Sequence, residues 1–91
     1  MIKTFRSKAL KQYWTTGNGS KLPVQDHGRV SRILNALDAA TAPSDMDLPG
    51  FKFHQLQGKP LRYSVWASGN YRVTFEWEQP DALKVDLEDY H

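Results

Sequence analysis

The fold is decided by one stretch of the chain, Tyr71-Arg72-Val73-Thr74-Phe75-Glu76-Trp77. Its odd-numbered positions are all apolar and its even-numbered positions are all polar. Successive side chains of a β-strand point to opposite faces of a sheet, so this alternation predicts a strand with one buried and one polar face. The polar face then carries Arg72, Thr74 and Glu76.

Further strands are expected on both sides of this stretch. Residues 62–67 precede it across the turn signal Ser68-Gly69-Asn70, and residues 83–87 follow it across Gln79-Pro80-Asp81. Residues 51–56 begin with alternating Phe51 and Phe53 and predict one more strand. Short connections between consecutive strands predict an antiparallel meander.

The first half of the chain has helical spacing instead. One apolar stripe is formed by Phe5, Ala9, Leu10, Tyr13 and Trp14, and a second one by Val30, Ile33, Leu34 and Leu37. Gly17 is a plausible cap for the first helix, and Pro23 suits the first turn of the second. Arg29 and Arg32 lie off the second stripe, so we expect both to face solvent. Residues 1–5 are an alternative short edge strand.

These elements predict an α+β fold, in which two N-terminal helices pack on one face of a small antiparallel sheet. Ninety-one residues make one domain, which we expect to span residues 1–91. The other sheet face stays open. On the last strand, that face would carry Lys84, Asp86, Glu88 and Tyr90.

Composition narrows the function. The chain has no cysteine, and none of His27, His54 and His91 has a partner at metal-ligand spacing, so we expect no metal and no cofactor. No apolar run approaches the length of a membrane span, and the first residues lack the apolar stretch of a signal peptide. We therefore expect a soluble cytoplasmic protein with no membrane partner.

Charge is unevenly distributed along the chain. Residues 1–37 hold seven of the twelve basic residues but a single acid, Asp26, whereas residues 38–91 hold nine of the ten acids. The basic part could face a polyanion such as RNA, although a solvated helical surface has the same pattern. The acidic part argues against a protein that simply coats nucleic acid.

The open face collects groups that suit phosphoryl chemistry. By alternation His54, Arg72 and Tyr90 all point there. Guanidinium binds phosphate bidentately, and RNA carries its own nucleophile, so cleavage needs only a base, an acid and charge stabilisation. Each residue also has a structural explanation. Arg72 could pair with Glu76 or Glu88, Tyr90 could close the sheet, and His54 could be a hydrogen-bonded strand residue.

The chain resembles HigB-type toxins of the RelE/ParE superfamily, which are the toxin half of type II toxin–antitoxin modules. The resemblance covers essentially the whole chain in order. Its motifs are Met1-Ile2-Lys3-Thr4-Phe5, Leu37-Asp38-Ala39-Ala40-Thr41, Phe53-His54-Gln55-Leu56-Gln57-Gly58, Asn70-Tyr71-Arg72-Val73-Thr74-Phe75 and Asp89-Tyr90-His91.

The resemblance implies a RelE-like microbial ribonuclease-type fold and a ribosome-dependent, metal-independent endoribonuclease that cuts mRNA and inhibits translation. By position it implies catalytic roles for His54, Arg72, Asp89, Tyr90 and His91, and RNA-binding roles for Lys59 and Asn70. One departure is Gln57, where many HigB-type sequences carry lysine, and Lys59 is the candidate substitute.

The resemblance also implies partners. They are the ribosome, mRNA and a HigA-like helix-turn-helix antitoxin, with the toxin monomeric inside a hetero-oligomeric complex. Two alternatives stay open at this point. One is a ParE-like toxin that binds gyrase without nuclease activity, against which the terminal Tyr90-His91 pair argues. The other is a non-catalytic RNA-binding module that uses the same sheet face.

Overall fold

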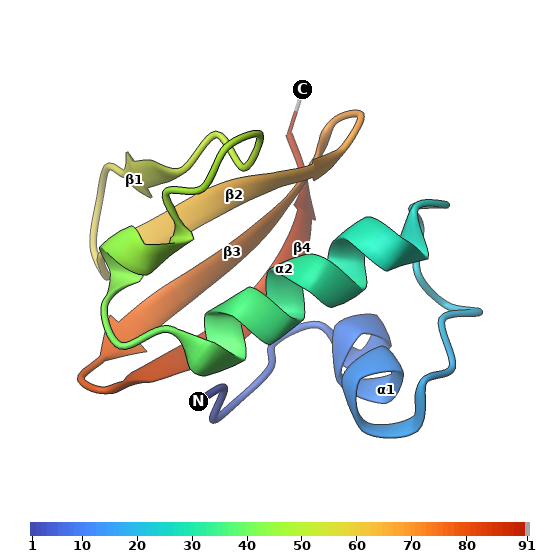
Figure 1. The fold of residues 1–91 in the computed structure, drawn as a ribbon. Helices are drawn as coiled ribbons and strands as arrows, with labels where there is room; N and C mark the ends of the chain where they lie inside the picture. The colour runs from blue at the N-terminus through green and yellow to red at the C-terminus, as the bar shows by residue number, and fades with distance from the viewer. Residues whose placement is uncertain (91) are drawn as a thin grey trace.

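The computed structural model describes residues 1–90, so the predicted site residue His91 lies outside the described residues. A four-stranded antiparallel sheet has the order β1-β2-β3-β4 (Figure 1). Its strands are β1 (His54–Leu56), β2 (Arg62–Ser68), β3 (Tyr71–Glu78) and β4 (Asp81–Asp89). The meander is confirmed, but the first strand is shorter than residues 51–56.

Two α-helices and a short 3₁₀ helix precede the sheet, namely α1 (Lys8–Thr16), α2 (His27–Ala39) and η1 (Pro43–Met46). The Ser7 hydroxyl accepts the Leu10 N–H at the start of α1, and Gly17 ends this helix in the left-handed conformation at φ 78°. The Asp26 carboxylate caps α2. Pro23 therefore precedes α2 and does not lie in its first turn, because Asp26 supplies the stronger start signal.

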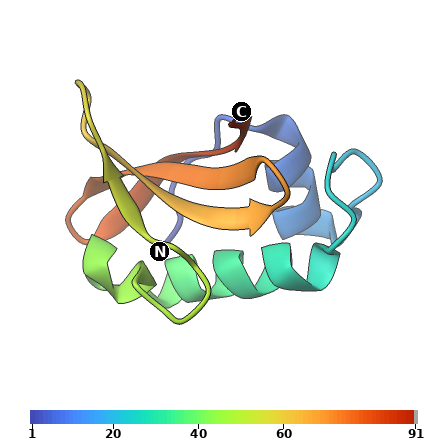
Figure 2. The same cartoon turned by 90° about the horizontal axis from the view of Figure 1, so that it is seen from above.

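Both helices pack on the same face of the sheet, as the sequence predicts. Figure 2 shows α2 running along one face of the sheet, so that the helix forms one layer and the strands form the other. The core between the layers contains Leu10, Val30, Ile33, Leu34, Leu37, Val65, Val73, Phe75 and Val85, all of them fully buried. The opposite face, which carries Arg72, Thr74 and Glu76, is not covered by a helix and is called the open face below.

The first residues extend the sheet beside β4. Isolated parallel bridges join Ile2 to Ala82 and Phe5 to Val85. The Lys3 N–H donates to the Ala82 carbonyl at 2.8 Å, and the Ala82 N–H donates to the Met1 carbonyl at 3.0 Å. Residues 1–5 thus form the edge segment that the sequence offered as an alternative. They pair through two isolated bridges and do not form a regular strand.

A bulge in β4 changes the side-chain alternation that the sequence predicts. Thr74 pairs with Asp86 but Glu76 pairs with Leu83, so two residues of β4 stand opposite one residue of β3. Lys84, at φ 49°, lies in this bulge. Leu83 is therefore opposite Glu76 and not on the core face, whereas Ala82 and Val85 are both fully buried.

Arg29 does not face solvent, and that expectation is wrong. Its guanidinium donates from Nη2 to the carbonyl oxygens of Gly50 at 2.6 Å and Trp66 at 3.0 Å. It also stacks over the rings of Trp66, at 4.7 Å, and Phe51, at 5.5 Å from the ring centroids. Arg29 joins α2 to β2 and to the loop before β1, while Arg32, three residues later, is exposed as expected.

We predict that Arg29→Ala lowers the free energy of unfolding by about 1–3 kcal/mol, because the carbonyls of Gly50 and Trp66 lose a charged donor. Arg32→Ala is the matched control, since it removes the same charge from an exposed position of the same helix, and it should cost less than about 0.5 kcal/mol. Urea unfolding of both variants measures the difference. Equal losses in the two variants would contradict a structural role for Arg29.

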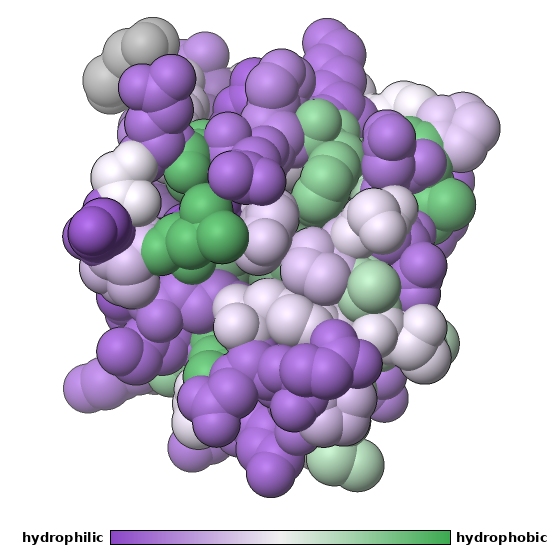
Figure 3. All heavy atoms as spheres, turned by 90° about the vertical axis from the view of Figure 1, so that its left-hand side faces the viewer, coloured by the Kyte–Doolittle hydropathy of each residue, from purple (hydrophilic) through white to green (hydrophobic). Residues whose placement is uncertain are grey.

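In the described part of the chain, neither α1 nor α2 is long and apolar enough to cross a membrane. Among residues 1–90, four large hydrophobic side chains are exposed, namely Met1, Leu48, Leu61 and Tyr90. Figure 3 agrees, because hydrophilic side chains cover most of the face it shows and hydrophobic ones form small patches. Recognition through this face would therefore be largely polar.

Candidate functional site

A cavity of about 340 Å³ opens on the open face. Its walls come from β1 and the loop after it, from β2 and β3, and from the residue that follows β4. We call it the Arg72 pocket. It is lined by His54, Gln55, Leu56, Gln57, Ser64, Arg72 and Tyr90. Three residues predicted from sequence, His54, Arg72 and Tyr90, therefore lie around one cavity.

Strand register explains how distant residues meet in this pocket. His54 pairs with Ser64, and Ser64 pairs with Thr74 on the next strand. Residues directly opposite each other in a sheet point to the same face, so these three form a row across the open face. Arg72 lies two residues from Thr74 along β3 and so points to that face as well.

Arg72 is held beside the Tyr90 ring, with its guanidinium carbon 5.9 Å from the ring centroid. Among the described residues, three buried side-chain nitrogen or oxygen atoms lack a hydrogen-bond partner, and two of them, Arg72 Nη1 and Ser64 Oγ, belong to residues that line the Arg72 pocket. Leaving a buried donor unpaired costs about 1–3 kcal/mol, and more when the group is charged. The two unpaired donors therefore predict that the pocket binds an anion.

Sequence reasoning did not select Ser64. Its position carries a signal, however, because Ser64 is a small polar residue between Tyr63 and Val65 in a strand. The same alternation that selected Arg72 on β3 places Ser64 on the polar side of β2. The register to His54, which only the structure gives, makes it part of the pocket.

His54 is exposed, and its ring is oriented by a backbone contact. Nδ1 lies 2.8 Å from the Lys52 carbonyl oxygen. A carbonyl only accepts hydrogen bonds, so Nδ1 carries the proton in this contact and Nε2 of the neutral ring is left as an acceptor. His54 is therefore arranged to take up a proton at Nε2.

The end of β4 is fixed through the β2–β3 turn. The Tyr90 N–H donates to the Asn70 carbonyl oxygen at 2.6 Å, and Asp89 pairs with Tyr71. Asp89 and Asn70 are both exposed, and neither lines the Arg72 pocket. The catalytic role expected for Asp89 and the RNA contact expected for Asn70 therefore stay predictions.

A second cavity of about 450 Å³ adjoins the first and shares Leu56, Gln57 and Tyr90 with it. Lys59 lines this second cavity together with Arg6, Arg62 and Glu88. Gln57, the departure from the usual lysine, lines both cavities. The positive charge of Lys59 thus reaches the neighbouring cavity and not the Arg72 pocket itself.

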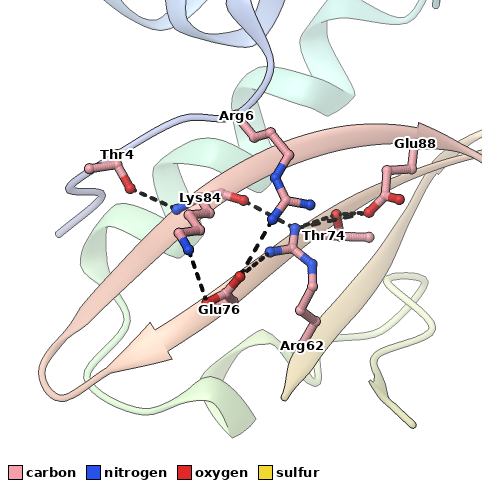
Figure 4. Close-up of polar contacts among 7 residues, drawn as sticks. All are labelled: Thr4, Arg6, Arg62, Thr74, Glu76, Lys84 and Glu88. Carbon is pink, nitrogen blue, oxygen red and sulfur yellow. Dashed lines mark hydrogen bonds and ion pairs between the residues drawn. The ribbon is translucent and has the colours of Figure 1, made fainter. Parts of the chain in front are cut away.

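A network of polar residues, two of which line the second cavity, was not predicted from the sequence (Figure 4). We call it the Arg62 network; it consists of Arg62, Thr74, Glu76 and Glu88. Arg62 donates from Nη1 to Glu76 Oε2 at 2.9 Å and from Nη2 to Thr74 Oγ1 at 2.8 Å. The side chain of Arg62 is 11% exposed, so these contacts are largely shielded from water.

The contacts of this network exclude one structural explanation for Arg72, namely an ion pair with Glu76 or Glu88. The ion pairs among residues 1–90 join Glu76 to Arg6, Arg62 and Lys84, and join Glu88 to Arg62. None of them joins Arg72 to either glutamate. The carboxylates that would have occupied Arg72 are engaged by Arg62, which leaves Arg72 facing the pocket.

Two helices on one face of an antiparallel sheet, with a pocket lined by Arg72 on the other, agree with the RelE-like fold that the resemblance implies. Comparison with protein families agrees, because residues 3–91 match the family described as the RelE-like toxin of the type II toxin–antitoxin system HigB. The chain belongs to this HigB family. A type II family implies a protein antitoxin as partner.

Two relatives support the assignment over nearly full length. The chain is 37% identical over 92 aligned positions to a protein named Endoribonuclease HigB from Proteus vulgaris, and the match covers all of both chains. It is 32% identical to Toxin HigB-1 from Vibrio cholerae serotype O1, with 97% of this chain and 96% of the relative covered. The family predicted from sequence is confirmed, and the Proteus relative is named for the predicted activity.

Proposed function

We propose that this chain is a ribosome-dependent endoribonuclease that cuts mRNA and thereby inhibits translation. One observation carries the proposal. Arg72, whose Nη1 is buried without a hydrogen-bond partner, lines a pocket together with His54 and Tyr90. An anion site between two groups that can transfer protons is what cleavage of a phosphodiester requires. The name of the Proteus relative points to the same reaction.

The reaction uses the RNA's own 2′-hydroxyl as nucleophile. His54 Nε2 takes the proton of this hydroxyl as its oxygen attacks the phosphorus atom. The bond from phosphorus to the 5′-oxygen breaks, and the leaving oxygen takes the proton of the Tyr90 hydroxyl. The products are a 2′,3′-cyclic phosphate and a 5′-hydroxyl end, and solvent then returns a proton from His54 to Tyr90.

Arg72 and Ser64 stabilise the charge that develops on the phosphoryl oxygens in this scheme, since both line the pocket and each has a donor without a partner in the folded chain. No step draws on a metal ion or a cofactor. Asp89 and His91 complete the site by their place in the family motif. Lys59, which lines the second cavity, and Asn70, whose carbonyl oxygen accepts the Tyr90 N–H, are the proposed RNA contacts.

Gel analysis of mRNA after incubation with the purified chain tests this function. We expect discrete cleavage products when ribosomes are present and intact mRNA when they are absent. If mRNA stays intact in both reactions while DNA gyrase is inhibited, the chain acts as a ParE-like toxin. If RNA co-sediments with the chain without being cut, it is a binding module.

The antitoxin partner is proposed to be a HigA-like helix-turn-helix protein that binds one toxin monomer within a hetero-oligomeric complex. The proposal rests on the type II family, whose toxins are neutralised by a protein. Co-expression with the protein encoded by the neighbouring gene, followed by affinity capture of the toxin, tests it.

The basic surface of the helices is proposed to dock on ribosomal RNA. Lys8, Lys11 and Arg32 are exposed, whereas Arg29 is structural and does not belong to this surface. We predict that charge reversal at all three exposed positions weakens ribosome binding and flattens its salt dependence. Co-sedimentation with ribosomes over a salt series measures both. An unchanged profile would show that these charges are only solvated surface.

A further inference from the structure

We propose that Arg62 is a positioning residue, which holds Glu88 away from Arg72 so that Arg72 stays available for a phosphate group. The proposal rests on the proposed function for its effect on cleavage. Its structural part does not, because the positions of Glu88 and Arg72 can be observed without any RNA.

The strand register alone favours a different arrangement. Arg72 and Glu88 are direct partners on β3 and β4, so their side chains start from adjacent points on the open face. Opposite charges at such positions form cross-strand ion pairs. A carboxylate bound to Arg72 would compete with a phosphate for the same donors.

In the structure Glu88 turns toward β2 instead. Its Oε2 accepts a short hydrogen bond from the Thr74 hydroxyl and lies 3.9 Å from Arg62 Nη2. The same Nη2 donates to Thr74 Oγ1 at 2.8 Å and to the Lys84 carbonyl at 3.1 Å. Because Arg62 fills the acceptor side of the hydroxyl, Thr74 presents its proton to Glu88.

Arg62 is more important for Glu88 than for Glu76. Glu76 has two further cations nearby, Arg6 at 3.6 Å and Lys84 at 4.0 Å. Among residues 1–90, the ion pair of Glu88 is the one with Arg62. Loss of Arg62 would therefore leave Glu88 as the carboxylate in need of a cation, and Arg72 is its direct partner across the strands.

The test is a double-mutant cycle in the full chain. We expect Arg62→Gln to lower kcat/KM for ribosome-bound mRNA by roughly tenfold or more, mainly through KM, because Glu88 then occupies Arg72. In a Glu88→Gln background the same Arg62→Gln change should cost less than about threefold. If Arg62→Gln lowers kcat/KM as much in the Glu88→Gln background as in the original chain, Arg62 does not act through Glu88. The same conclusion follows if Arg62→Gln leaves kcat/KM of the original chain unchanged.

A crystal structure of Arg62→Gln without RNA gives a second readout that a merely structural role would not move. We expect the Glu88 carboxylate within about 4 Å of the Arg72 guanidinium. Glu88 still bound to Thr74 would overturn the proposal. If Arg62→Gln does not fold, Thr74→Val replaces it, because it removes the hydroxyl that holds Glu88 and keeps the Arg62–Glu76 pair. If the original chain cuts no mRNA, the proposed function fails, and the crystal structure still decides the role of Arg62.

Discussion

Replacing Arg72 by alanine should lower the rate of mRNA cleavage by about 100-fold or more and abolish growth arrest, while the fold is kept. The reason is that the Arg72 guanidinium has a donor that is not used within the folded chain. Nη1 is buried without a partner and Arg72 lines the pocket, so the alanine variant loses the group that is proposed to bind the phosphate. It loses no hydrogen bond that Nη1 makes within the folded chain. Cleavage assays and circular dichroism on the purified variant measure the two effects.

Arg72→Lys separates charge from geometry in the same experiment. Lysine keeps the positive charge but lacks the planar fork that contacts two phosphate oxygens. It should therefore recover only part of the activity. A folded Arg72→Ala variant that cuts mRNA at a near-normal rate would instead assign Arg72 a structural role, such as support of the Tyr90 ring.

A chain stopped after Asp89 should fold and bind its antitoxin but leave mRNA uncut. β4 ends at Asp89, and Tyr90 is 37% exposed with one backbone hydrogen bond, to Asn70. Removing residues 90 and 91 therefore changes stability little. The truncation does remove the Tyr90 hydroxyl, which is the proposed general acid. The rate of mRNA cleavage is therefore expected to fall by about 100-fold or more. Cleavage and growth assays at equal expression measure it.

Single variants divide this effect between the two residues. Tyr90→Phe keeps the ring against Arg72 and removes only the hydroxyl, so it should be folded and nearly inactive. His91→Ala reports on the other member of the motif. A shortened chain as toxic as the full one would contradict the assignment. If the shortened chain unfolds, Tyr90→Phe decides the role of the hydroxyl.

The sequence predicts the layers of this fold well, because its strongest patterns are local. The alternation over residues 71–77 is preserved in β3, where Val73 and Phe75 are fully buried. Helix ends that are marked by a local signal are also predicted correctly, as at Gly17, which caps α1. The bulge at Lys84 escapes prediction because it depends on how β4 pairs with β3 and with residues 1–5.

The candidate site is predicted in part for the same reason. His54, Arg72 and Tyr90 were found because each lies in a strand pattern or a family motif. Arg29 was misjudged and Arg62 was missed because their hydrogen-bond partners are distant in sequence, and Ser64 was missed because its place beside His54 follows only from the strand register. Arg29 reaches the carbonyl of Trp66, 37 residues away, and Arg62 reaches Glu76, 14 residues away. Composition and spacing do not reveal such contacts.

The separation of the two faces explains how stability and chemistry coexist in so small a chain. The core face of the sheet holds apolar side chains against α1 and α2. The open face carries the Arg62 network, which engages its glutamates, and beside it the Arg72 pocket with its unpaired donors. Among residues 1–90, the buried side-chain nitrogen and oxygen atoms without a partner therefore belong to residues of the face that is proposed to bind RNA.

The most direct test of this account compares two ribosome-bound mRNAs that differ by one atom. One has ribose throughout, and the other has 2′-deoxyribose at the nucleotide that supplies the attacking hydroxyl. The proposed reaction predicts that the first is cut, leaving a 2′,3′-cyclic phosphate, and that the second stays intact. Cleavage of the deoxy mRNA at the same position and rate would contradict it, because the nucleophile could then not be the 2′-hydroxyl.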